Sequence, residues 1–152
     1  MSLKEKISAD LKTAMKSGDV LRRETLRTVW ATIIELDKRG VKREPTEEEE
    51  LQVIIGATKK RKEAIEQYEK AGRKDLADQE TRELAIINEY LPKQLTSQEL
   101  ESHIRDVIAR VGAVSGKDFG KVMPVAMKEL KGKAEGKLIQ ETVKRILETT
   151  TN

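Results

Sequence analysis

Three lysines near the C-terminal end of the chain recur at helical spacing, and ammonium groups arranged in this way can bind phosphate. These residues are Lys117, Lys121 and Lys128. At about 100° per residue, the three positions fall on one face of a helix. A row of ammonium groups on a helix can contact the phosphates of a nucleic acid without reading its bases. We call these three residues the lysine stripe and take it as a candidate RNA-binding surface.

The segment that follows the stripe extends this candidate site. Residues 131–137 read KGKAEGK, so ammonium groups alternate with flexible backbone. We call this segment the lysine turn. The candidate RNA-binding residues within it are Lys131, Gly132, Lys133, Gly136 and Lys137. The same pattern is also typical of an ordinary solvated helix face that ends at a C-cap glycine, here Gly132. Residue spacing alone favours that alternative, which stays open.

A helix over 115–130 is predicted to position the stripe. Ser115 and Asp118 have the spacing of a capping box, and Val114 and Phe119 have that of a hydrophobic staple. The residues at the i, i+3, i+4 and i+7 positions predict one buried face: Phe119, Val122, Met123, Ala126, Met127 and Leu130. Pro124 removes the backbone hydrogen bond to Gly120, so we expect a kink in this helix.

Charge and composition narrow the classes of protein that this chain can be. Residues 1–116 hold 22 Lys or Arg and 22 Asp or Glu, whereas residues 117–152 hold 8 and 5, so the whole net charge of +3 lies in the last segment. This distribution favours an anionic partner for that segment. The chain has no cysteine and one histidine, which excludes disulfides and multi-histidine metal sites. We expect no metal and no cofactor.

Membrane segments are not expected either. The first residues lack the apolar stretch of a signal peptide, and no apolar run approaches about 18 residues. We therefore expect a cytoplasmic protein without a membrane partner.

Capping signals and apolar periodicity divide the chain into about four helices and then about three, an all-α fold. The first helix follows Ser2 and ends at Gly18, and the second follows Asp19 and ends at Gly40, before a loop at Val41–Pro45. Pro92 then breaks the fourth helix, and Thr96 begins the fifth with a new capping box and a Leu95–Leu100 staple. The predicted domains are 1–92, with four helices, and 93–152, with three helices. The three helices of the second domain span about 97–111, 115–130 and 137–147.

The third helix carries the strongest local signals of the first domain. Thr46 and Glu49 form a capping box, and the run of four glutamates at 47–50 predicts a solvated first turn that complements the helix dipole. The helix reaches about Gly72, with Arg61 inside its apolar stripe. A guanidinium there either has a carboxylate or carbonyl partner or lies at the edge of the stripe. Asp75 is the predicted N-cap of the fourth helix.

Catalytic chemistry has no recognisable set of residues in this chain. Acyl transfer needs a nucleophile beside a positioned base, and no such pair is apparent. His103 flanks an apolar face without a second histidine, so we assign it a structural role. Residues 132–137 lack the spacing of a P-loop and a preceding strand. The residues therefore indicate a binding or interaction module.

Several segments resemble one known family. They are the run Arg61–Leu76, the tripeptide Tyr90-Leu91-Pro92, and the stretch from Gly120 through Gly136. The chain resembles the YqeY family of small bacterial proteins (GatB/YqeY) from Leu3 to about Leu147. The resemblance implies a helical N-terminal domain followed by a three-helix domain similar to the tail of the B subunit of the bacterial tRNA-dependent amidotransferase. That tail contacts tRNA and performs none of the chemistry.

Two hypotheses of different classes follow. In the first, the protein is a non-catalytic module that binds tRNA or another RNA through the lysine stripe and the lysine turn. In the second, it is an adaptor whose N-terminal helices dock onto a protein of translation or tRNA amidation. The candidate contact residues of the adaptor lie in the run that carries the resemblance: Arg61, Glu66, Tyr68, Arg73 and Asp75. A weaker alternative, implied by resemblance alone, is a carbon–nitrogen ligase with glutamine as amido-N-donor.

Overall fold

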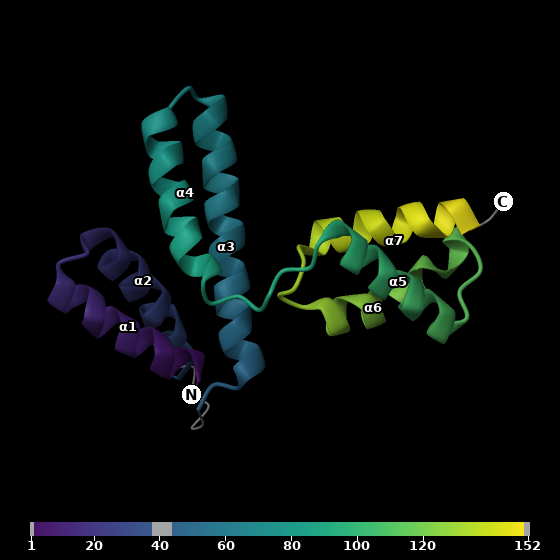
Figure 1. The fold of residues 1–152 in the computed structure, drawn as a ribbon, viewed down its shortest axis with the longest axis horizontal. Coiled ribbons are helices and arrows are strands. Elements are labelled where there is room, and N and C mark those ends of the chain that lie inside the picture. Colours follow the sequence, from purple (N-terminus) through teal and green to yellow (C-terminus); the bar gives the residue numbers. More distant parts are fainter. Residues whose placement is uncertain (1, 38–43, 151–152) are drawn as a thin grey trace. The chain divides into compact units, whose positions relative to one another are not determined.

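The computed structural model describes residues 2–37 and 44–150, and its ordered elements in these ranges are all helices (Figure 1). No strand occurs in the described residues, so the all-α prediction is confirmed. The chain divides into two compact units, Met1–Leu91 and Pro92–Asn152, which we call the N-terminal and C-terminal units. Across the same ranges, no helix combines the length and the apolar character needed to cross a membrane.

Four helices build the N-terminal unit: α1 (Leu3–Ser17), α2 (Val20–Asp37), α3 (Glu47–Lys70) and α4 (Lys74–Asn88). The predicted capping boxes at Ser2 and Thr46 are both present and begin α1 and α3. Asp19 caps α2, because its carboxylate accepts a hydrogen bond from the backbone N–H of Arg22 at 3.1 Å. The predicted end of this helix at Gly40, and residues 41–43 of the predicted loop Val41–Pro45, lie outside the described residues.

The turn between α3 and α4 differs from the prediction at Asp75. Gly72 has a φ of 72°, and the N–H of Arg73 donates to the carbonyl of Tyr68 at 2.8 Å, which is a Schellman ending. Because α4 begins directly after this motif, Arg73 occupies the N-cap position and makes no side-chain cap. The prediction that Asp75 is the N-cap is therefore wrong. Its carboxylate lies inside the first turn of α4 and pairs with the Arg73 guanidinium at 3.1 Å.

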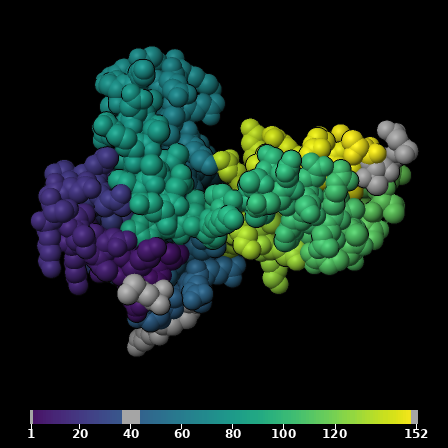
Figure 2. Space-filling view, viewed as in Figure 1, coloured from purple at the N-terminus to yellow at the C-terminus, as the bar shows by residue number. Residues whose placement is uncertain are grey.

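The core of the N-terminal unit lies at one end of a long helical hairpin. Its buried residues are Ile7, Leu26, Val29, Ile33, Ile54, Ile86, Ile87 and Tyr90. The hairpin formed by α3 and α4 continues well past this cluster, and its turn end extends beyond α1 and α2 (Figures 1 and 2). Tyr90 belongs to this cluster, and its hydroxyl donates to the Asp10 carboxylate at 2.5 Å.

Glu50 corrects the prediction for the four-glutamate run. Glu47 and Glu48 are exposed, as predicted for a solvated first turn, but Glu50 is only 3% exposed. The Lys4 N–H, in the first turn of α1, donates to the Glu50 Oε2 at 3.3 Å. The carboxylate therefore satisfies an otherwise unpaired amide at the positive end of α1. Glu50, in the first turn of α3, thus stabilises the first turn of α1.

Three α-helices and a short 3-10 helix build the C-terminal unit: α5 (Ser97–Val111), η1 (Gly116–Asp118), α6 (Phe119–Leu130) and α7 (Gly136–Thr150). Thr96 caps α5, and Gly112 ends it with a φ of 71°. The core runs the length of the three α-helices. Its buried residues are Leu100, Ile104, Val107, Ile108, Ala113, Val122, Ala126, Leu130, Ile139, Val143, Ile146 and Leu147.

Two predictions for the sixth helix need correction. The Ser115–Asp118 box is present, but it caps η1, and Val114 is 71% exposed, so the predicted staple is not buried. Met127, predicted in the core, is 40% exposed. It lies at the edge of the buried face, near the start of α7: a Cβ added to Gly136 would lie 3.3 Å from the Met127 Cε. The α-helix itself continues through Pro124 to Leu130.

Candidate nucleic-acid interface

The lysine stripe is solvent-exposed and extends along α6. Lys117 lies in η1, and Lys121 and Lys128 lie two turns apart on α6. The twelve residues of α6 span about 18 Å, so the stripe is a row and not a single pocket. The Lys121 Nζ lies 3.7 Å from the Asp118 Oδ1. Lys117 and Lys128 make no ion pair with any part of the chain that the structure describes.

The lysine turn joins α6 to α7 at the far end of the row from Lys117. Gly132 adopts a φ of 77°, as expected for a glycine that follows a helix end. Lys133 and Lys137 are exposed, whereas Lys131 is half-buried and has an interaction partner. Gly136 is the first residue of α7. The five candidate residues of the turn therefore lie at the C-terminal end of α6, the end nearer to Lys128. Lys117 lies at the opposite end, just before α6.

Residues before α5 fix the shape of the lysine turn. The Gln94 Nε2 donates to the carbonyl of Gly132 at 2.6 Å and to the carbonyl of Pro92 at 2.8 Å. The backbone N–H of Leu95 donates to the carbonyl of Lys133 at 2.9 Å. Two consecutive carbonyls of the turn are thus held by a segment 38 residues away. The sequence carries no signal for this pairing, because a glutamine in a loop has no periodicity to mark it.

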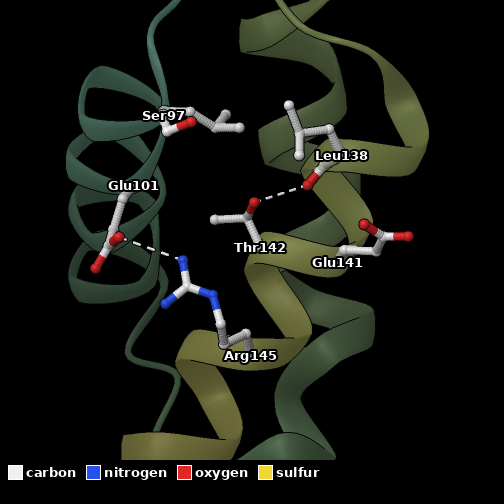
Figure 3. A pocket seen from close by; sticks show the side chains of 7 residues that line it. Ser97, Glu101, Leu138, Glu141, Thr142 and Arg145 are labelled. Atoms are coloured by element: carbon white, nitrogen blue, oxygen red, sulfur yellow. Dashed lines mark hydrogen bonds and ion pairs between the residues drawn. The ribbon is translucent and has the colours of Figure 1, made fainter.

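The arginines of the C-terminal unit are paired with carboxylates. Glu101 of α5 accepts from Arg105 at 2.9 Å. It also accepts from Arg145 of α7 at 3.2 Å, as Figure 3 shows. Hydrogen bonds from Arg105 and then from Arg145 lower the pKa of the Glu101 carboxyl. Arg110 of α5 likewise joins Glu129 of α6 at 2.7 Å and holds the pKa of that carboxyl below its ordinary value. The arginines therefore tie helices together, and the exposed lysines carry the excess charge.

Asp118 organises the start of the stripe. Its Oδ2 accepts from the backbone N–H of Val114 at 2.8 Å and of Ser115 at 3.3 Å. The Val114 hydrogen bond is the main cause that lowers the pKa of the Asp118 carboxyl, and Lys121 adds to the effect. A carboxylate stays charged here, beside two lysines of the stripe. It neutralises part of the charge at this end of the row.

A cleft between α5 and α7 has a volume of about 290 Å³ and is drawn in Figure 3. Its polar groups are largely committed to structure. Glu101 and Arg145 join the two helices, and the Thr142 hydroxyl donates to the Leu138 carbonyl at 2.7 Å. No nucleophile stands beside a base among the side chains drawn there. In the described ranges, no group of three or more His, Asp or Glu side chains is placed to hold a metal ion.

His103 of α5 is half-buried and lies beside α6. Its Nε2 is 3.4 Å from the Glu129 Oε2, the carboxylate that Arg110 also contacts. This arrangement links α5 to α6. It gives His103 the structural role that the sequence predicts.

The candidate interaction residues of the N-terminal unit do not share one face of the α3–α4 hairpin. Arg61 points toward α4, 3.7 Å from the Glu83 carboxylate, and donates to the carbonyl of Ala57 at 3.3 Å. These are the carboxylate and carbonyl partners predicted for a guanidinium in the stripe. Glu66 is exposed and pairs along α3 with Lys70 at 3.1 Å. Tyr68 is half-buried, and Arg73 and Asp75 pair with each other at the turn.

Comparison with known proteins identifies relatives over most of the chain. The family described as Yqey-like protein matches residues 4–147. A Vanderwaltozyma polyspora protein named "Altered inheritance of mitochondria protein 41, mitochondrial" is 32% identical over 128 residues, which cover 76% of this chain and 66% of that protein. An uncharacterised Schizosaccharomyces pombe protein, C22F3.15, is 33% identical over 96 residues, which cover 63% of this chain and 77% of that protein.

These names describe the relatives, and neither states a chemical activity. The family match, by contrast, extends over nearly the whole chain and includes both helical units. It agrees with the family resemblance carried by the segments around Tyr68, Pro92 and Gly120. This chain belongs to the YqeY family.

Proposed function

We propose that this chain is a non-catalytic RNA-binding protein, with tRNA as the first ligand to test, and that its C-terminal unit provides the contacts. One observation carries the proposal. Each arginine of the C-terminal unit is paired with a carboxylate, whereas the stripe and the turn present five exposed lysines, four of them without an ion pair in the described residues. Unpaired, exposed ammonium groups on a rigid helix are suited to contact phosphate.

The distribution of net charge also favours the C-terminal unit over the N-terminal unit as the RNA-binding part. Residues 92–152 hold 11 Lys or Arg and 8 Asp or Glu, whereas residues 1–91 hold 19 of each. An excess of three charges is modest, but it is concentrated on a three-helix unit. Phosphate binding depends on local charge more than on the charge of the whole chain. The neutral N-terminal unit is the weaker candidate for RNA.

The test is a tRNA titration at several salt concentrations with two charge-matched variants. Replacement of Lys117, Lys121 and Lys128 by Gln should leave the fold intact, because exposed substitutions usually change stability by within about 0.5 kcal/mol each. The variant should bind tRNA more weakly, and its log–log salt slope should flatten by ~0.7–0.9 for each phosphate that it no longer neutralises. The control replaces Lys59, Lys60 and Lys74, three exposed lysines of the N-terminal unit, by Gln.

Equal affinities and equal slopes for the wild type and the stripe variant would contradict the proposal for this surface. The stripe would then be an ordinary solvated face. A weaker affinity in the control variant instead would move the RNA site to the α3–α4 hairpin. Ammonia release from glutamine with ATP and misacylated tRNA, by protein free of amidotransferase, would support the ligase alternative.

A second candidate function is supported by the exposed end of the α3–α4 hairpin. Beyond the core cluster, Ala64, Ile65, Tyr68, Leu76 and Leu84 are only half-buried, because no third helix covers them in the described unit (Figure 1). Half-buried apolar residues on a projecting hairpin are suited to contact another protein. This favours the adaptor hypothesis for the N-terminal unit. Binding of a purified translation protein that Tyr68→Ala abolishes and the lysine variant preserves would establish it.

A further inference from the structure

A second cleft of the C-terminal unit lies between η1 and the later turns of α7. Its volume is about 240 Å³. Its lining combines one aromatic ring, one amide, one ammonium group and one carboxylate: Gly116, Phe119, Gln140, Lys144, Leu147 and Glu148. It differs from the α5–α7 cleft, where Glu101 and Arg145 pair with each other across the gap. Two polar side chains that line the second cleft, Gln140 and Lys144, have no partner among the described residues.

Phe119 provides the apolar wall of this cleft. It is the sole Phe, Trp or Tyr of residues 92–152. The side chain packs against the core cluster but is only partly buried, so part of the ring faces the cleft. Helical spacing predicts a place in the core for Phe119 and gives no sign of this second surface. A partly exposed ring on a wall of a cleft can stack on a nucleobase, a contact that tolerates any base because every base has a π-face.

Gln140 and Lys144 provide the polar groups on α7. Both side chains are exposed, and neither makes a hydrogen bond or ion pair with the described residues. A Gln amide offers two donors and one acceptor, which suit the polar edge of a base. Lys144 lies two turns after Lys137 on the same face of α7, so it continues the exposed lysines of the turn. Glu148 also lines the cleft, but it already has an interaction partner, so the polar groups available to a base are those of Gln140 and Lys144.

The remaining wall is open. A Cβ added to Gly116 would meet no atom within 4 Å, so nothing fills the space beside η1. Lys117, the first residue of the stripe, follows Gly116 directly. The cleft therefore lies where the stripe begins. A nucleotide that placed its base here would have ammonium groups on either side for its phosphates.

We propose that this cleft binds one unstacked nucleobase of a single-stranded RNA segment, with the base on the Phe119 ring and a neighbouring phosphate at Lys144. The inference rests on the proposed RNA-binding function and narrows its ligand to an RNA with accessible bases. A base within a duplex is stacked on both faces and cannot enter such a cleft, whereas loops and single strands offer unstacked bases.

The experiment compares a short single-stranded RNA with an RNA duplex of the same length, each titrated against the full chain. Phe119→Leu keeps an apolar side chain against the core and removes the ring. It should weaken single-strand binding roughly 5- to 150-fold, the range for removal of one stacked base, without a change in the salt slope. Lys144→Gln should reduce the slope for the single strand by ~0.7. Met127→Leu, an exposed apolar change at the other end of α6, should alter neither.

A second variant guards against a folding defect in Phe119→Leu. Gln140→Ala changes an exposed side chain and should weaken binding to a smaller extent, with the circular dichroism spectrum unchanged. If the wild type binds single strands and both variants bind them equally well, the nucleobase site is wrong while RNA binding stands. If Phe119→Leu weakens duplex binding as much as single-strand binding, the ring acts through the fold and the site is also wrong. If the wild type binds no RNA, the proposed function itself fails.

Discussion

The two units of this chain bury their apolar residues differently, although both are built from α-helices. In the C-terminal unit the buried cluster runs along all three α-helices. In the N-terminal unit the cluster occupies one end, and the outer half of the α3–α4 hairpin has Ala77 as its one fully buried residue among those described. The C-terminal unit has a complete core and an uneven charge, whereas the N-terminal unit has an even charge and an incomplete core.

This difference separates two kinds of binding surface. A unit whose apolar residues are satisfied internally can expose charge, and the excess of lysine then favours an anionic ligand. A hairpin that extends past its own core leaves half-buried apolar residues at its surface, and these favour a protein partner. Each candidate function therefore belongs to a different unit. Experiments that disturb one unit while sparing the other test this division.

The largest effect is expected from a charge placed in the C-terminal core. Ile104 is completely buried in α5, so Ile104→Asp should unfold the C-terminal unit. The two core clusters share no residue, so the N-terminal unit should stay folded. Circular dichroism should show a partial loss of helix. The fluorescence of Trp30, the one tryptophan, should report an unchanged N-terminal unit.

Met127→Asp is the matched control in the same unit. Because Met127 is 40% exposed, we expect this variant to stay folded, which reverses the expectation drawn from its helical spacing. Loss of the Trp30 signal in Ile104→Asp would show that the units depend on each other. We expect fragments 1–91 and 92–152 each to fold alone, and loss of the Trp30 signal would contradict this expectation.

A smaller effect should distinguish the two halves of α3. Ile54 is completely buried, whereas Ile65, three turns later on the same face, is half-buried. Ile54→Ala should lower the free energy of unfolding by about 2–5 kcal/mol, the usual range for a core deletion. Ile65→Ala should lower the free energy of unfolding by clearly less than Ile54→Ala, because it leaves a smaller cavity. Urea denaturation followed by Trp30 fluorescence measures both, and equal losses would mean that the core extends along the whole hairpin.

The elements of the fold follow largely from local sequence signals. Capping boxes at Ser2 and Thr46 and left-handed glycines at Gly18 and Gly112 each act within one turn of a helix, so the residues beside them are sufficient to predict them. The buried positions of α7 likewise follow from periodicity alone: Ile139, Val143, Ile146 and Leu147.

The features that sequence did not predict depend on which helices meet. Periodicity gives the angle of Met127 around α6, but its exposure depends on where α7 begins. Glu50 is buried because the start of α1 lies against it, at a separation of 46 residues. The Gln94–Gly132 hydrogen bond spans 38 residues. Contacts of this kind depend on tertiary packing and leave no local pattern. The Phe119 cleft belongs to the same class, because its walls come from η1 and α7.

The smallest effect expected is a different response of the two units to acid. In the C-terminal unit, partner hydrogen bonds lower the pKa values of Glu101 and Glu129. A carboxyl whose folded-state pKa is lowered stabilises the fold above its unfolded pKa, and this contribution is lost as pH falls through the lowered value. In the N-terminal unit, burial and the nearby Glu80 raise the pKa of Glu83, against the opposing effect of Arg61. Glu83 therefore favours the fold below its unfolded pKa, and its contribution is lost as pH rises through the raised value.

Acidification from neutral pH through the pH range in which carboxyls titrate should therefore lower the stability of the C-terminal unit. In the N-terminal unit it should remove the destabilisation that the charged form of Glu83 causes. Glu101 and Glu129 are exposed enough for solvent to screen them, so the change in stability should be small. Amide hydrogen exchange resolves the two units within the full chain. Glu101→Gln should flatten the pH dependence of exchange in α5 and α7, because the carboxylate that pairs with Arg105 and Arg145 is gone. Glu83→Gln should instead remove the opposite dependence in α3 and α4. If Glu83→Gln left the pH dependence of exchange in α3 and α4 unchanged, this would contradict the contrast between the paired surface carboxylates and the half-buried Glu83.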